Sequence, residues 1–83
     1  MDRFADMHMF VSVVETGSIS AAAERLGVAK SAVSRRLTEL ESRLGASLVQ
    51  RTTRRLNLTD SGRAYYDRCV VILADLDEAE AAV

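Results

Sequence analysis

Hydrogen-bond donors crowd into the segment VAKSAVSRRL, residues 28–37, which has the pattern of the start of a helix. Serine hydroxyls and the cations of Lys and Arg can donate to phosphates and to base edges. The same residue types also make an ordinary solvated helix face. Which description applies depends on the elements that aim these side chains.

Charge is distributed unevenly along the 83 residues, although the net charge is only −1. Residues 25–55 hold eight cations and two acids, and both flanking segments are acidic. A basic block in an acidic chain is expected where one surface meets phosphates. A block that is merely solvated is the alternative.

Length and composition indicate one small domain, near the lower limit for a self-supporting core. The single cysteine, Cys69, precludes an intrachain disulfide and fits a reducing compartment. No apolar run approaches the roughly 18 residues of a membrane span, and residues 1–4 lack the layout of a signal peptide. We therefore expect a soluble, cytoplasmic protein that has no membrane partner.

Hydrophobic periodicity predicts three helices in the first half of the chain, over about residues 3–15, 21–26 and 30–44. A glycine is placed to end each of them, at Gly17, Gly27 and Gly45. Asp2 can cap the first helix, and the segment Ser18-Ile19-Ser20 can cap the second.

The period changes after residue 45. Two short strands are predicted over residues 48–52 and 56–58, around a turn at Thr53-Arg54-Arg55. Thr59 can then cap a last helix that runs to the end of the chain. The expected order is helix, helix, helix, hairpin, helix.

The second and third helices have the spacing of a helix-turn-helix. Ala23 allows the helices to approach, Gly27 supplies a left-handed turn, and Val33 buries the second of the two helices. A chance helical hairpin could share this spacing. The third helix strengthens the prediction, because its apolar residues fall within about 60° of arc. Its opposite arc carries small hydroxylated residues and Arg, which suit a helix lying close to a DNA groove.

The last helix carries an apolar seam spaced 4, 3, 4, 3, 4, formed by Tyr65, Cys69, Ile72, Leu76, Ala79 and Val83. Tyr66, Val70 and Leu73 form a neighbouring stripe that can pack on the body of the domain. A second copy of the chain is the expected cover for the seam. One broad stripe buried within a monomer is the alternative.

Three segments together resemble the N-terminal domain of the LysR-type transcriptional regulators: GSISAAAERLGVAKSAVSRRL, LESRLGASL and RTTRRLNLTDSG. The resemblance covers nearly the whole chain. It implies a mainly α, winged helix-turn-helix domain over residues 1–58, made of three helices and a short β-hairpin wing. A long linker helix over residues 59–83 would form the dimer interface.

The resemblance also implies site residues for double-stranded DNA. The first turns of the third helix enter the major groove, a role that falls to Lys30, Ser31, Ser34, Arg35 and Thr38. Where the family commonly has SQPAVSR, this chain has AKSAVSR. Ala29 thus lacks the hydroxyl that would cap the helix, and Ser31 is the alternative cap one turn later. Lys30 suits guanine or phosphate better than adenine.

In the wing, Arg54 is placed for the minor groove, and Arg55 and Thr52 for the flanking backbone. Arg51 either pairs with Glu41 or contacts a phosphate. Ser18 and Ser20, at the start of the second helix, either hold a phosphate or only cap the helix.

By the same resemblance, two copies join through antiparallel linker helices and bind an inverted-repeat operator to regulate bacterial transcription. The segment LDEAEAAV ends without a helix stop signal. We therefore expect an excised domain whose ligand-sensing domain is absent here, with a naturally short protein as the alternative. A small-molecule effector and RNA polymerase are expected as partners of the full-length protein only.

No enzyme, cofactor or metal site is expected in this chain. His8 is the only histidine, Cys69 has no neighbouring histidine to activate it, and neither a Cys/His cluster nor a Gly-rich phosphate loop occurs. Two other functions compete with specific DNA binding. One is a protein–protein interaction module with a basic surface, and the other is a sequence-independent architectural DNA binder.

Overall fold

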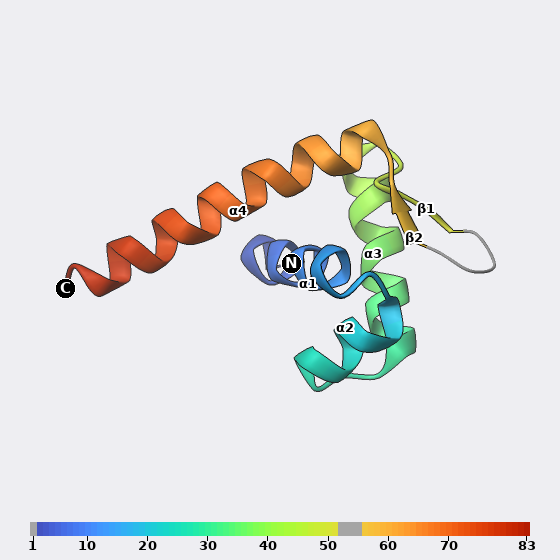
Figure 1. Ribbon diagram of the computed structural model, residues 1–83, viewed down its shortest axis with the longest axis horizontal. Coiled ribbons are helices and arrows are strands. Elements are labelled where there is room, and N and C mark those ends of the chain that lie inside the picture. The colour runs from blue at the N-terminus through green and yellow to red at the C-terminus, as the bar shows by residue number, and fades with distance from the viewer. Residues whose placement is uncertain (1, 52–55) are drawn as a thin grey trace.

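The computed structural model describes residues 2–51 and 56–83 (Figure 1). Within them, helices and strands follow the predicted order: α1 (Arg3–Thr16), α2 (Ile19–Leu26), α3 (Lys30–Leu44), β1 (Val49–Arg51), β2 (Leu56–Leu58) and α4 (Asp60–Ala81). The first three helices form the body, with the hairpin beside α3. The long α4 crosses α1 and extends past the body to the C-terminus (Figure 1).

Side-chain caps set the starts of three helices. Asp2 accepts from the Ala5 amide, Ser18 from the Ala21 amide, and Thr59 from the Gly62 amide. Because Ser18 alone caps α2, that helix starts two residues earlier than predicted. α1 runs one residue further than predicted, and α4 stops two residues before the C-terminus.

The start of α3 differs from the starts of the other three helices. Its N-cap is Ala29, which makes no side-chain hydrogen bond, and Ser31 lies inside the helix. The alternative that Ser31 caps α3 is therefore wrong. At the other ends, α1, α2 and α3 stop at glycines with φ of +73°, +70° and +68°, as the sequence predicted.

The core lies between α1, α2 and α3, and the strands close its end. Its buried side chains are Met9, Phe10, Val13, Ala22, Ala23, Val33, Leu37, Leu40, Leu48 and Val49. The helix-turn-helix prediction is confirmed, since Ala23 and Val33 are buried on either side of the left-handed Gly27. Leu44 departs from the predicted stripe: it is 41% exposed at the end of α3.

The hairpin is antiparallel and pairs Val49 with Leu58, Gln50 with Asn57, and Arg51 with Leu56. The first strand begins at Val49 rather than at the predicted Leu48. The Leu48 carbonyl instead accepts from the Thr59 amide at 3.1 Å, which joins the start of β1 to the cap of α4.

Gly62 permits this close approach of α4 to the chain before β1. A Cβ atom at position 62 would lie only 1.9 Å from the Leu48 carbonyl oxygen, which is backbone and cannot swing aside. Gly62 lies in the first turn of α4, where no turn or helix end requires a glycine. The reason for this glycine is tertiary packing.

We expect Gly62→Ala to lower the free energy of unfolding by about 1–3 kcal/mol, because the clash displaces the first turn of α4. In an unobstructed helix the same change would stabilise by about 1 kcal/mol. Urea unfolding followed by circular dichroism measures the difference. Ser61→Ala, an exposed change in the same turn, is the control and should cause no loss. Stabilisation by Gly62→Ala would contradict the packing described here.

Candidate nucleic-acid interface

The outer face of α3 presents the donors predicted from the sequence. Burial of Val33, Leu37 and Leu40 turns the opposite side of the helix outward. The side chains that this orientation brings together are Lys30, Ser31, Arg35 and Thr38, all exposed, and Ser34, which is half-buried. Thr38 donates to the Ser34 carbonyl at 3.1 Å, so its hydroxyl is partly used within the helix.

Three cations of the basic block are engaged in ion pairs that join one helix to another. Arg36 and Arg43 both pair with Asp6 of α1, at 3.1 and 3.4 Å. Asp6 is buried, so its charge is compensated on two sides. Arg25 pairs with Glu15 at 2.6 Å and joins α2 to α1. These three arginines hold helices together.

The two cations on the outer face of α3 are far less constrained. Lys30 has no ion pair within the described part of the chain. Arg35 lies 3.8 Å from Glu39 one turn later, and both side chains remain about two-thirds exposed or more. An exposed pair of this kind contributes little and can open to meet another anion.

The wing is joined to α3 through contacts that the sequence did not predict. Glu41 accepts hydrogen bonds from the Leu48 and Val49 amides at 2.7 and 3.3 Å. The alternative that Arg51 pairs with Glu41 is therefore wrong: the Glu41 carboxylate binds the backbone at the start of β1 and forms no ion pair with Arg51. Arg51 instead donates to the Ser34 hydroxyl oxygen on α3, at 3.2 Å.

The remaining predicted contacts divide into two groups. Thr52, Arg54 and Arg55 of the wing lie outside the described residues. Ser18 caps α2 through its hydroxyl, while Ser20 is exposed in the first turn of the same helix. Capping thus accounts for Ser18, whereas phosphate binding at either serine stays a prediction.

Along α4, the predicted dimer seam is only partly open. Cys69 is 0% exposed because it packs into the body of its own chain, so the seam available to another chain excludes it. Tyr65, Ile72 and Leu76 are half-buried, and Ala79 and Val83 are exposed. Val70 was expected to pack on the body but is 42% exposed. One helical residue, a rotation of 100°, separates it from the buried Cys69.

Tyr65 and Cys69 share the protected side of α4. Burial, together with the neighbouring thiol, raises the pKa of Tyr65 to about 12. Burial also raises the pKa of the Cys69 thiol, against the opposing effect of its hydrogen bond with Tyr65. The Tyr65 ring packs on Phe10 with 5.3 Å between centroids. Both groups therefore stay protonated at neutral pH and serve to pack α4 on α1.

Within residues 2–51 and 56–83, no three His, Cys, Asp or Glu side chains gather as a metal site would require. His8 is exposed on α1. None of the described helices is both long and apolar enough to cross a membrane.

The position of Asp6 in the sequence is a signal for its ion pairs that the sequence analysis did not recognise. Asp6 stands three residues before Met9 and four before Phe10, so it lies on the apolar side of α1. A charge at such a position needs a partner, and Arg36 and Arg43 provide it.

Two packed helices joined at a left-handed glycine, a preceding helix that covers them, and a two-stranded hairpin beside the second define a winged helix-turn-helix domain. The sequence-family model for bacterial regulatory helix-turn-helix proteins of the LysR family matches residues 4–63 of this chain. The chain belongs to this family.

Known relatives agree with this assignment. The chain is 48% identical over 83 residues to an HTH-type transcriptional repressor of Pseudomonas aeruginosa (strain UCBPP-PA14). It is 54% identical over 78 residues to an HTH-type transcriptional regulator of Xanthomonas campestris pv. campestris (strain 8004). These matches cover 100% and 94% of this chain but 26% and 23% of the relatives, so the chain spans about a quarter of their length.

A solved structure shows the same fold. The BenM DNA-binding domain in complex with catB site 1 DNA superposes with a TM-score of 0.93 at 30% identity. The match covers 99% of this chain and 90% of that one.

Proposed function

We propose that this domain binds double-stranded DNA in a sequence-specific way and regulates transcription, with α3 as the recognition helix. The observation that carries the proposal is the sorting of the basic block. Arg25, Arg36 and Arg43 are held in ion pairs between helices. Lys30 has no ion pair within the described residues and Arg35 lies near only Glu39 of its own helix, and both are exposed beside short hydroxylated side chains. The similarity to a domain crystallised with DNA supports this proposal.

Each part of the interface has a chemical role in this proposal. Lys30 and Arg35 donate to guanine edges or phosphates, and the serines of α3 donate to base acceptors at close range. Arg54 of the wing enters the minor groove, with Arg55 and Thr52 on the backbone. The start of α2, with Ser18 and Ser20, faces a phosphate. Nothing in this arrangement calls for catalysis, and we assign a regulator's function.

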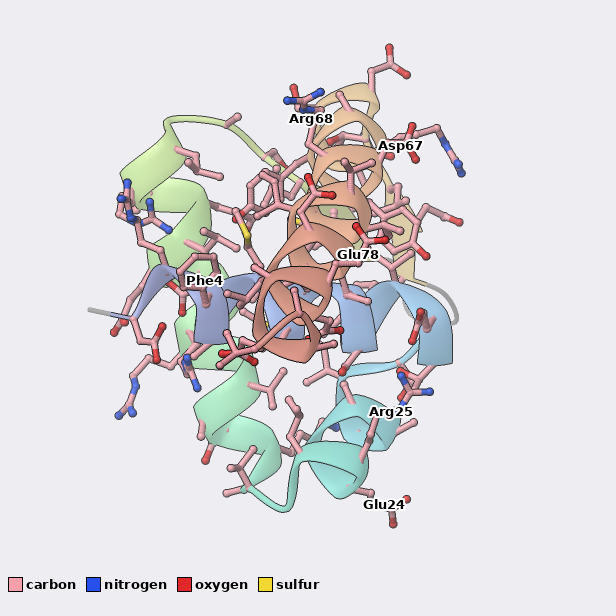
Figure 2. The ribbon with its side chains drawn as sticks, turned by 90° about the vertical axis from the view of Figure 1, so that its left-hand side faces the viewer. Phe4, Glu24, Arg25, Asp67, Arg68 and Glu78 are labelled. Atoms are coloured by element: carbon pink, nitrogen blue, oxygen red, sulfur yellow. The ribbon has the colours of Figure 1, made fainter. Side chains whose placement is uncertain are left out.

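We also propose that the domain acts as a homodimer, and a groove beside α4 supports this. The groove holds about 390 Å³ and is lined by Arg3, Phe4, Met7, Arg43, Leu44, Tyr65 and Ile72. Phe4 is 47% exposed, and it lies beside α4 near the start of α1 (Figure 2). Exposed apolar side chains gathered in one groove are typical of an interaction surface.

The occupant that suits this groove is the last part of α4 from a second copy. Residues 69–83 carry four acids and no cation, with Leu76, Ala79 and Val83 on one side. Arg3 stands at the groove and complements those acids. An antiparallel pair crossing near Ile72 would bring the acidic segment of each copy to the groove of the other.

A two-fold dimer of this kind binds an inverted repeat, with half-sites about one helical turn apart. For the longer protein we propose a ligand-sensing domain that follows the linker helix and takes a small-molecule effector, contact with RNA polymerase, and a cytoplasmic location. The relatives' greater length supports the additional domain.

The proposal is tested by selecting bound sequences from a random duplex pool and measuring the winner by fluorescence anisotropy over a salt series. We expect an inverted repeat, and log K should fall by about 0.9 per log salt for each neutralised phosphate. Equal binding of all duplexes would instead indicate an architectural protein. No enrichment with only weak binding would favour a protein-interaction module.

In the same selection, Lys30→Gln should change the preferred base at one position of each half-site, because an amide suits adenine and an ammonium suits guanine. Affinity for random duplexes should fall far less than the preference changes. A uniform loss on every duplex would instead make Lys30 a phosphate contact.

For the dimer, we expect Phe4→Ser to raise the dimer dissociation constant at least tenfold in sedimentation equilibrium, because Phe4 loses its apolar contact with the second copy. Val71→Ser is the matched control, since Val71 is 50% exposed on α4 but outside the groove. Equal effects of the two changes, or none from Phe4→Ser, would place the dimer contact elsewhere.

A further inference from the structure

The start of β1 and the last residue of β1 are each fixed to α3 by one acidic or basic side chain. At the start of the strand, Glu41 of α3 accepts from the Leu48 and Val49 amides. At its end, Arg51 donates through Nη1 to the Ser34 hydroxyl oxygen. The Ser47 hydroxyl lies 3.5 Å from the same Glu41 oxygen, while its shorter contact is to the Val49 carbonyl, to which it donates at 3.1 Å.

The distance between these two contacts is about the same along α3 as along β1. Ser34 and Glu41 are seven residues apart, which is two helical turns on nearly the same face and about 10 Å along the axis. From Leu48 or Val49 to Arg51 an extended chain covers about 7–10 Å. Strand and helix therefore lie alongside each other and are joined at both ends of the shared length. The bond from Arg51 thus gives the strand a second point of attachment to α3, in addition to its pairing with β2.

The hydrogen bond from Arg51 also constrains the hydroxyl group of Ser34. A serine hydroxyl has one hydrogen to donate and two lone pairs. With one lone pair occupied by the guanidinium, the hydrogen is directed away from Arg51 and is available to an acceptor. Guanine, adenine and thymine present such acceptors in the major groove, whereas the cytosine amino group is a donor.

We propose that Arg51 is a positioning residue for sequence recognition: its bond to Ser34 holds the wing strand on the recognition helix and fixes Ser34 as a hydrogen-bond donor to a base. The inference rests on the proposed DNA-binding function and deepens it. It gives Arg51 a role that neither an ion pair with Glu41 nor a simple phosphate contact would supply.

The test is a double-mutant cycle on the selected duplex and on duplexes with one base pair changed at a time. Arg51→Met removes the donor, Arg51→Lys keeps the charge but not the planar guanidinium, and Ser34→Ala removes the acceptor. We expect Arg51→Met and Ser34→Ala each to reduce discrimination roughly three- to tenfold at the same base pair. The double variant should lose no more than either single one.

Arg51→Lys separates positioning from simple charge attraction. It should lose the same discrimination as Arg51→Met while it keeps the wild-type salt slope. Gln50→Met, an exposed change on the same strand, is the control and should keep full discrimination. Circular dichroism of each variant checks that the domain is folded.

Three results would overturn the inference: wild-type discrimination in Arg51→Lys, additive losses in the double variant, or a uniform fall in affinity with a lower salt slope in Arg51→Met. The last would make Arg51 a phosphate contact. Failure of the proposed function is distinct, because the wild-type chain would then select no duplex at all.

Discussion

The structure depends on the burial of one side of α3. Val33, Leu37 and Leu40 are almost completely removed from solvent, and each such side chain contributes about 1.5–3 kcal/mol. A rotation of α3 by one residue would bring Ser34 and its neighbours toward the core and expose leucines. That cost fixes the angle of the helix about its own axis, so the polar arc faces outward as a consequence of packing.

Ion pairs then divide the basic block between structure and recognition. Asp6 and Glu15 of α1 take three arginines from α2 and α3, and these pairs join the helices around the core. The cations left at the outer face are the ones that can approach an anionic partner. A net charge near zero is compatible with such a surface because ten of the twelve acids lie outside residues 25–55, four of them within residues 69–83.

The wing and α4 are attached to this framework through backbone contacts. Glu41 binds two amides before and within β1, and the Leu48 carbonyl accepts from Thr59 at the start of α4. Gly62 leaves room for that carbonyl. The position of the wing beside α3 and the direction in which α4 leaves the body are thus set in one small region. The outer face of α3 and the groove beside α4 are thereby held in one fixed arrangement.

Local signals in the sequence determined the elements. Glycines and capping side chains gave the ends of the helices, and the apolar period of α3 gave both its buried side and its outward donors, because these effects act within a few residues. Ala23, Gly27 and Val33 likewise sufficed for the helix-turn-helix. Tertiary structure alone decided that Arg51 bonds to Ser34 rather than Glu41, that Cys69 faces inward while Val70 does not, and why position 62 is glycine. Those outcomes depend on which atoms meet across elements distant in the chain, where a 100° turn of a helix or a bond already made by Glu41 changes the partner.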